Sequence, residues 1–328
     1  METGNFSISY ITWSTAFIKD LDDNSSPVFQ QFLDNRAEIS EKLAKERETK
    51  TGTTVGLRND GFREGYGPSS QDVLIPAFLA AYSGTDVSLA STNIMPKIPK
   101  PNWRITYDGL SKLNLFKKLF KSFTLSHAYR SSYNIGSYTT NLLWVNNGQG
   151  YTDNTDINGN FIPQHQIAQI SITEQFSPLI NIDMGWHNSL LTRFELKRDR
   201  NLAFNFTDNR LQESIGKELI VGAGYRFPNV PFPFKIGPAR AKVKSDLNCR
   251  ADISFRNNRT MMRSVSENLH QPTGGQRIIS LKLAADYVLN QRVSLRLFYD
   301  KVLTAPVITT SFPSSNTNAG ISLRFTLA

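Results

Sequence analysis

The sequence contains a single cysteine, Cys249, in 328 residues. One cysteine leaves no intrachain disulfide and argues against a zinc site built from cysteine ligands. Long hydrophobic runs are also missing, because no stretch approaches the run of about 18 apolar residues that a membrane-spanning helix requires. The sequence therefore excludes a helical membrane protein. It does not exclude a membrane β-barrel, whose alternating strands average to a modest hydropathy.

Acidic residues are the scarcer of the two charged kinds. The chain has 28 Asp and Glu against 37 Lys and Arg, which gives a net charge of +9. This charge permits binding to nucleic acid, anionic lipid or an acidic partner, and it selects none of them. Aromatic residues are plentiful, with 21 Phe, 11 Tyr and 4 Trp. Because a disordered chain does not carry so many aromatic side chains, we expect the protein to fold.

The amino terminus shows no signal-peptide pattern. The stretch Met1 to Asn5 leads directly into the strand-like stretch Phe6 to Tyr10, without a basic region, an apolar core and a small-residue cleavage site. Two interpretations stay open: a cytoplasmic protein, or a piece whose exported beginning lies elsewhere.

The strongest pattern is a period of two residues in the last third of the chain. Between Lys242 and Arg256, the odd-numbered residues are mostly apolar and the even-numbered residues are mostly polar or charged. This alternation predicts a strand with one dry face and one wet face. The same pattern recurs at residues 279–289, 293–300 and 321–327.

Weaker copies of the pattern lie at residues 123–135, 190–197, 202–207 and 219–227, with a short connection at 198–200. We expect roughly a dozen to fourteen strands, joined alternately by short and long connections, as in outer-membrane barrels. The tight turns are predicted at 257–258 and 290–291, and the longer connections at 228–240, 270–276 and 304–318.

Helical signals dominate residues 20–100. The pair Ser26–Pro27 predicts a capped helix start, apolar residues follow at helical spacing, and Thr51–Gly52 predicts the end. A second helix is expected at 69–82, where Pro76 would kink or limit it. We interpret this region as a long insertion between strands.

Alternation also fits a soluble β-sandwich, whose strands keep one face in the core and one in water. Two features of the sequence favour a membrane β-barrel over a soluble sandwich. The polar residues of the alternating strands include both Lys or Arg and Asp, which suits a water-filled lumen. The apolar residues include Tyr or Phe near the strand ends, as in aromatic girdles. We predict that these residues face lipid: Val243, Leu247, Ile253, Phe255, Leu281, Leu283, Leu295, Leu297, Leu323 and Phe325. We predict that these face the lumen: Lys242, Lys244, Asp246, Arg250, Asp252, Lys282, Asp286, Arg296, Asp300 and Arg324.

Candidate chemical sites are weak. The four histidines share no ligand spacing. The stretch Asn154 to Gly159 matches half of a calcium loop, but His165 stands where Glu is required, which favours an Asx-rich turn. The stretch Gly222 to Gly224 lacks the third glycine of a dinucleotide fingerprint, and the carboxylates Glu174 and Asp183 have no pocket evidence. We therefore predict no catalytic residue, no cofactor, no metal and no enzyme.

A basic stretch at residues 112–121 interleaves four lysines with Leu and Phe. A nucleic-acid patch is one interpretation. The spacing better fits an amphipathic helical turn that rests on a membrane surface, so no nucleic acid is predicted as a partner.

Several segments, in this order along the chain, resemble the carboxyl-terminal region of the SprA/Sov family. The segments are Gly65–Pro68, Ile75–Phe78, Pro101–Leu110, Phe116–Arg130, Asn158–Pro163, Glu174–Ile180, Pro272–Gln276 and Gly320–Ala328. The members of this family are outer-membrane translocons of the type 9 secretion system in Bacteroidota. The resemblance runs from near Phe6 to the end.

The resemblance implies a location in the bacterial outer membrane and a function as a conduit for folded cargo proteins. It implies five partners: outer-membrane lipid, the remaining barrel strands, a carrier barrel of the PorV type, a periplasmic plug protein, and cargo with a carboxyl-terminal secretion domain. Family members are several times longer than this chain. We therefore expect only an arc of a very large barrel, with the other strands on an upstream part or another chain.

The predicted fold class is thus all-β, the carboxyl-terminal arc of an antiparallel transmembrane β-barrel. We expect a barrel strand at 1–19, a helix- and loop-containing insertion at 20–100, and transmembrane barrel strands at 101–328. A role of the insertion in gating or partner contact is a hypothesis. Two alternatives stay open: a passive outer-membrane porin or receptor barrel, and a soluble β-rich binding or adhesive protein.

Overall fold

The computed structural model describes residues 1–231, 244–267, 269–290, 293–308 and 312–325. The strands are β1 (Thr3–Ser9), β2 (Trp103–Tyr107), β3 (Phe120–Thr140), β4 (His165–Ile167), β5 (Gln169–Trp186), β6 (Leu190–Asn205), β7 (Arg210–Pro231), β8 (Lys244–Ser264), β9 (His270–Asn290), β10 (Val293–Pro306) and β11 (Ser314–Phe325). The helices are α1 (Pro27–Thr51), α2 (Gln71–Ser83) and α3 (Asn114–Leu119), with 3₁₀ turns η1 (Trp13–Thr15), η2 (Val87–Leu89) and η3 (Gly109–Lys112).

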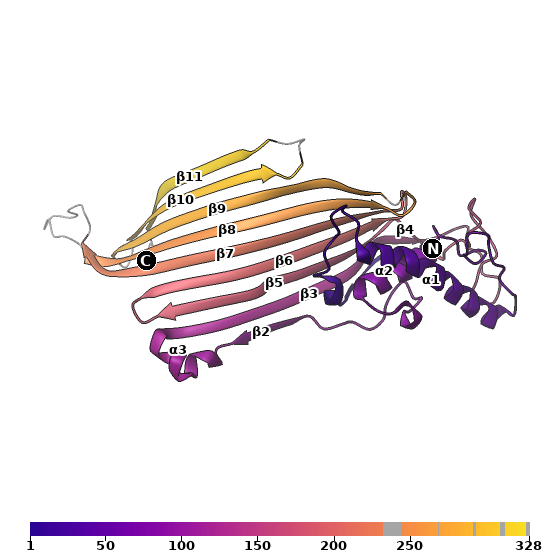
Figure 1. Ribbon diagram of the computed structural model, residues 1–328, viewed down its shortest axis with the longest axis horizontal. Helices are drawn as coiled ribbons and strands as arrows, with labels where there is room; N and C mark the ends of the chain where they lie inside the picture. The colour runs from indigo at the N-terminus through magenta and orange to yellow at the C-terminus, as the bar shows by residue number, and fades with distance from the viewer. Residues whose placement is uncertain (232–243, 268, 291–292, 309–311, 326–328) are drawn as a thin grey trace.

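All eleven strands belong to one antiparallel sheet (Figure 1). The order is β1-β3-β5-β6-β7-β8-β9-β10-β11, with β2 and β4 paired to β3. Most neighbours are consecutive in sequence, as hairpin connections require. The all-β class predicted from the alternation is confirmed. Among the described residues the sheet is open, with β1 and β2 near one edge and β11 at the other.

Within the described residues, the strands are fewer and longer than predicted. The predicted connection at 198–200 is wrong, because β6 runs through it, and so are the turn at 257–258, which lies inside β8, and the connection at 270–276, which lies inside β9. At 198–200, the buried Arg198 and Arg200 side chains donate hydrogen bonds to backbone carbonyls of residues 10–25, so β6 continues through this polar stretch. The connection predicted at 304–318 is shorter, since β11 begins at Ser314. Most of the connection predicted at 228–240 lies outside the described residues, and β7 extends to Pro231.

Both predicted helices of the insertion are confirmed. The Ser26 side chain accepts a hydrogen bond from the Phe29 N–H at 3.4 Å, Pro27 occupies the first turn, and α1 ends at Gly52 with a φ of 68°. Only glycine adopts that left-handed conformation without steric cost. Helix α2 continues through Pro76 to Ser83, so Pro76 does not limit it.

The main core lies between these helices and one end of the sheet. Figure 1 shows α1 and α2 together over the end at which β4 lies. The ring of Phe32 lies 5.9 Å from that of Phe78 and 5.7 Å from that of Phe204 in β6. The fully buried members of this core include Phe29, Phe32, Ile39, Val73, Leu74, Ile75, Phe78, Tyr82, Tyr133, Ile172, Leu202, Phe204 and Leu211. The insertion is therefore packed on the sheet as part of the same core.

Strand register shows which face the helices cover. Paired residues lie on the same face, and every second residue of a strand returns to that face. Buried Phe204 pairs with Leu211 of β7, which shares its face with Val221. Val221 pairs with Ile253, and Ile253 pairs with Leu281. Helices α1 and α2 therefore lie on the same face of the sheet as the apolar residues of the last strands. The helices cover one end of this face, and the apolar residues lie toward the other end.

Candidate functional site

An apolar band crosses β7 to β11 on this face. In β8 the band runs from Leu247 to Phe255. Phe255, Leu297 and Phe325 are 43%, 44% and 65% exposed. A protein in water rarely exposes so large a contiguous apolar surface, so the band marks contact with an apolar phase or another protein. Its exposed large members are Val221, Phe227, Phe255, Ile279, Leu283, Leu297, Leu303, Ile321, Leu323 and Phe325.

The opposite face of the same strands is polar and carries charges of both signs. Register places Lys282 opposite both Asp252 of β8 and Asp300 of β10. Arg296 pairs with Asp286, and its Nε lies 3.7 Å from the Asp286 carboxylate. The lysine and the arginine of these pairs are exposed and the aspartates are half-buried, so the pairs add little stability. Because opposite charges lie next to each other, this face is hydrophilic and carries little local net charge.

Glycines give these carboxylates room on the polar face. A Cβ on Gly222 of β7 would lie 2.2 Å from the Asp252 Oδ1, and a Cβ on Gly216 would lie 2.5 Å from the Asp199 carboxylate. The stretch Gly222 to Gly224 lies within a strand, and Gly222 serves close packing of this kind.

Among the described residues, those predicted to face lipid and those predicted to face the lumen lie on opposite faces of the sheet. Lys242 and Val243 lie outside the described residues. The remaining residues predicted to face the lumen share the polar face, and the remaining residues predicted to face lipid share the face of the apolar band. The chemical nature of what each face contacts stays a prediction.

Beyond the band, on the same face, residues 10–25 pack against the sheet around the buried side chain of Arg263. Arg263 of β8 is fully buried, with its Nη2 2.8 Å from the Asp20 carboxylate and its Nε 3.1 Å from the Glu213 carboxylate. Its Nη1 donates a hydrogen bond to the Asn24 carbonyl at 2.7 Å. A guanidinium can be buried only when such partners offset its lost hydration.

A second buried ion pair lies beside the first. Arg200 Nη2 lies 3.0 Å from Glu174 Oε2, and both side chains are at most 3% exposed. Glu174 Oε1 accepts hydrogen bonds from the Thr12 hydroxyl at 2.7 Å and the Tyr129 hydroxyl at 2.8 Å. Arg200 also donates to the Thr15 carbonyl at 3.2 Å. Sequence reasoning missed this pair, because its members are distant in sequence and no local pattern joins them.

The chemical sites judged weak from the sequence do not assemble. Asp183 lies away from Glu174 and pairs with Arg193 at 3.7 Å. Asp156 Oδ1 accepts 2.8 Å hydrogen bonds from the backbone N–H groups of Asn158 and Asn160, which is the predicted Asx-rich turn. Within the described part of the chain, no three His, Cys, Asp or Glu side chains gather as a metal site would require.

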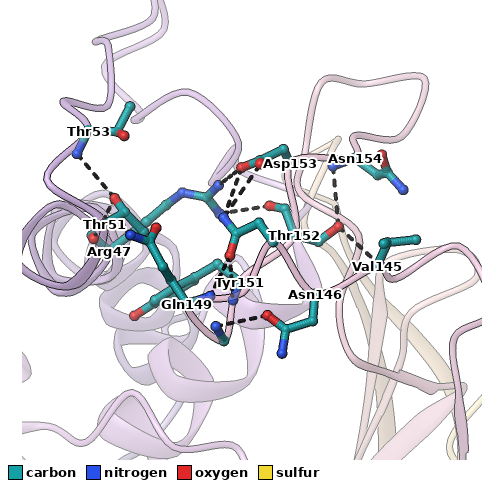
Figure 2. Close-up of polar contacts among 12 residues, drawn as sticks. Arg47, Thr51, Thr53, Val145, Asn146, Gln149, Tyr151, Thr152, Asp153 and Asn154 are labelled. Carbon is teal, nitrogen blue, oxygen red and sulfur yellow. Dashed lines mark hydrogen bonds and ion pairs between the residues drawn. The ribbon is translucent and has the colours of Figure 1, made fainter.

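A cavity of about 350 Å³ lies where α1 and α2 meet the connection 141–164. Arg47 forms part of its wall. Figure 2 shows the polar contacts by which Arg47 holds the connection in place. Its Nη1 donates to the Thr152 carbonyl at 2.9 Å, and its Nη2 contacts the Asp153 carboxylate at 2.5 Å. Its guanidinium also lies 3.8 Å above the Phe161 ring, a favourable cation–π contact.

Asp72 and His165 line the same cavity. Burial raises the pKa of the Asp72 carboxyl from 3.8 to about 6. His165 Nδ1 is buried and has no hydrogen-bond partner among the described residues. The cavity is therefore polar on one side, but it holds no nucleophile paired with a base and supports no assignment of chemistry.

The raised pKa of Asp72 predicts a pH effect. Because the folded protein binds this proton more tightly than the unfolded chain, the Asp72 contribution to stability falls as the pH rises from about 4 to about 6. Asp72→Asn is expected to stabilise α2 at neutral pH by an amount of order 1 kcal/mol and to leave stability below about pH 4 unchanged. Hydrogen exchange of α2 amides in both proteins, followed across this range, measures the difference. Identical pH profiles would contradict the assignment.

Comparison with protein-family models finds no family that matches the chain, and a search of curated proteins finds no match either. Among the helices that the structure describes, none is long and apolar enough to cross a membrane.

Proposed function

We propose that this chain forms part of the wall of an outer-membrane barrel and lines a polar conduit for protein transport. The observation that carries the proposal is the apolar band, which lies on one face of five neighbouring strands while the other face carries paired charges. A soluble sandwich would bury such a band against a second sheet or other elements, whereas here its large side chains are exposed.

The height of the band fits a bilayer. The nine residues from Leu247 to Phe255 span about 30 Å along the strand, at about 3.3 Å each. With the strand tilt of about 40° that is usual in membrane barrels, this corresponds to an apolar height near the usual 25 Å. The 21 residues of β8 exceed what the bilayer needs, so the strand extends beyond it.

The open edges of the sheet support a composite wall. In hydrocarbon, each unpaired backbone group costs several kcal/mol, so β11 and the strands at the other edge need partners there. We propose that further strands, upstream or on another chain, supply them. The polar face then lines a wide, wet path that performs no chemistry and offers cargo little to adhere to.

The finer assignment rests on the resemblance to the SprA/Sov family. It gives a translocon segment of the type 9 secretion system in the outer membrane of Bacteroidota. The partners are then a PorV-type carrier barrel, a periplasmic plug protein and cargo with a carboxyl-terminal secretion domain. Since α1 and α2 lie on the face of the apolar band, the proposal puts them outside the lumen and beyond the bilayer. Contact with a neighbouring protein suits them better than plugging the conduit.

Fractionation and co-purification test this proposal. In its native bacterium, the protein is expected to remain with outer membranes after carbonate and high-salt washing, and to co-purify with a carrier barrel and cargo. Release by carbonate would instead support a soluble binding or adhesive protein. Retention without any carrier or cargo would support a passive porin or receptor.

A further inference from the structure

The basic segment, defined here as residues 109–121, concentrates positive charge and exposed apolar side chains. It comprises η3, α3 and the start of β3. Between Gly109 and Lys121 the sequence has four lysines and no acidic residue. The four are Lys112, Lys117, Lys118 and Lys121, all exposed, and none of them forms a salt bridge in the described part of the chain.

Leucines alternate with these lysines and are exposed as well. Leu113, Leu115 and Leu119 are 53%, 70% and 50% exposed. Three exposed leucines among four unpaired lysines form an amphipathic surface of the kind that lies at a lipid interface. A nucleic-acid surface would gain nothing from exposed leucines.

Aromatic rings attach the basic segment to the sheet. Phe116 of α3 lies 5.9 Å from Phe120 and 4.9 Å from Phe123, and Phe120 lies 4.5 Å from Trp186 of β5, all between ring centroids. The His187 Nε2 is 3.0 Å from the Lys117 carbonyl oxygen. The segment is thus held in one position.

That position is at the end of the apolar band and on the same face. Phe123 pairs with Met184, Met184 with Thr192, and Thr192 with Ala223 of β7. Ala223 is two residues from Val221, a member of the band, so all these side chains share its face. Figure 1 shows α3 at the end of the sheet opposite α1 and α2.

We infer that the basic segment binds the headgroups of anionic phospholipids at one surface of the bilayer. The inference rests on the proposed function, which puts the apolar band in hydrocarbon. The leucines then enter the boundary between headgroups and acyl chains, the aromatic rings form part of an interfacial girdle, and the lysines reach the phosphates. The segment thereby fixes the depth at which this part of the barrel wall lies in the bilayer.

Vesicle binding by the full-length chain tests the inference. The probes are vesicles of phosphatidylcholine alone and vesicles of equal parts phosphatidylcholine and phosphatidylglycerol, at low salt. The unaltered chain is expected to bind both, and the anionic vesicles more tightly. Since one lysine near an anionic surface contributes about a fivefold change in binding, Lys117→Gln with Lys118→Gln should weaken anionic binding about 25-fold. Binding to neutral vesicles should stay unchanged.

The matched control is Lys97→Gln with Lys100→Gln, which removes two exposed lysines that lie before β2, where the Lys100 N–H donates a hydrogen bond to the Ser9 carbonyl, and outside the basic segment. This control should lose much less anionic binding than the segment variant. Equal losses in both variants, or no preference for anionic vesicles, would overturn the inference while leaving the proposed function intact. Failure of the unaltered chain to bind either vesicle would overturn both.

Discussion

Replacing Leu283 with arginine is expected to lower the stability of the membrane-inserted protein by about 2 to 4 kcal/mol, the usual penalty for a cation at mid-bilayer depth on a barrel's lipid face. Leu283 is 39% exposed, and it pairs with Ala251 and Tyr299 near the middle of the band. The substitution therefore removes no core packing. Carbonate-resistant membrane retention and urea unfolding of the inserted protein measure the effect.

The control lies on the same strand. Ser280→Arg in β9 adds the same side chain on the polar face, opposite Ser254 and Val302, where no like charge pairs with it. It should change stability by less than about 0.5 kcal/mol, as surface substitutions usually do. If Leu283→Arg is equally harmless, the band does not meet hydrocarbon. If both are harmful, the sheet is buried on both faces, and neither outcome is compatible with the proposed wall.

Sequence alone predicted the features that depend on local chemistry. The apolar and polar faces of β8 to β11 were predictable because neighbouring side chains of a strand alternate between the two faces of the sheet. The limits of α1 were readable because Ser26, Pro27 and Gly52 each perform a local backbone role. Such features need no knowledge of distant residues.

The parts that sequence did not predict depend on contacts between distant segments. The stretches at 198–200 and 257–258 are predicted as short connections because polar residues interrupt the alternation there. In the structure, Arg198 and Arg200 donate hydrogen bonds to backbone carbonyls of residues 10–25. Asp199 pairs with Arg256 of β8, so β6 continues through this stretch. The position of α1 and α2 on the face of the apolar band was likewise not predictable, because only the strand register in the structure shows it.

The buried ion pair of Glu174 and Arg200 gives the second large effect. Arg200→Met is expected to destabilise the docking of residues 10–25 on the sheet by about 3 to 5 kcal/mol, because the buried Glu174 side chain would lose the cation with which it forms an ion pair. Limited proteolysis and hydrogen exchange of residues 10–25 measure this, since loss of docking exposes their backbone amides.

A double-mutant cycle separates this pair from simple loss of packing. Glu174→Gln with Arg200→Met removes both charges and should recover much of the stability lost by Arg200→Met alone, because no unpaired buried charge remains. Thr12 and Tyr129 can still donate hydrogen bonds to the glutamine carbonyl. If the double variant is as unstable as the sum of the single variants, the pair contributes by packing and not by charge compensation. Recovery would instead show that residues 10–25 stay docked on the sheet when Glu174 is replaced by a neutral side chain of the same size.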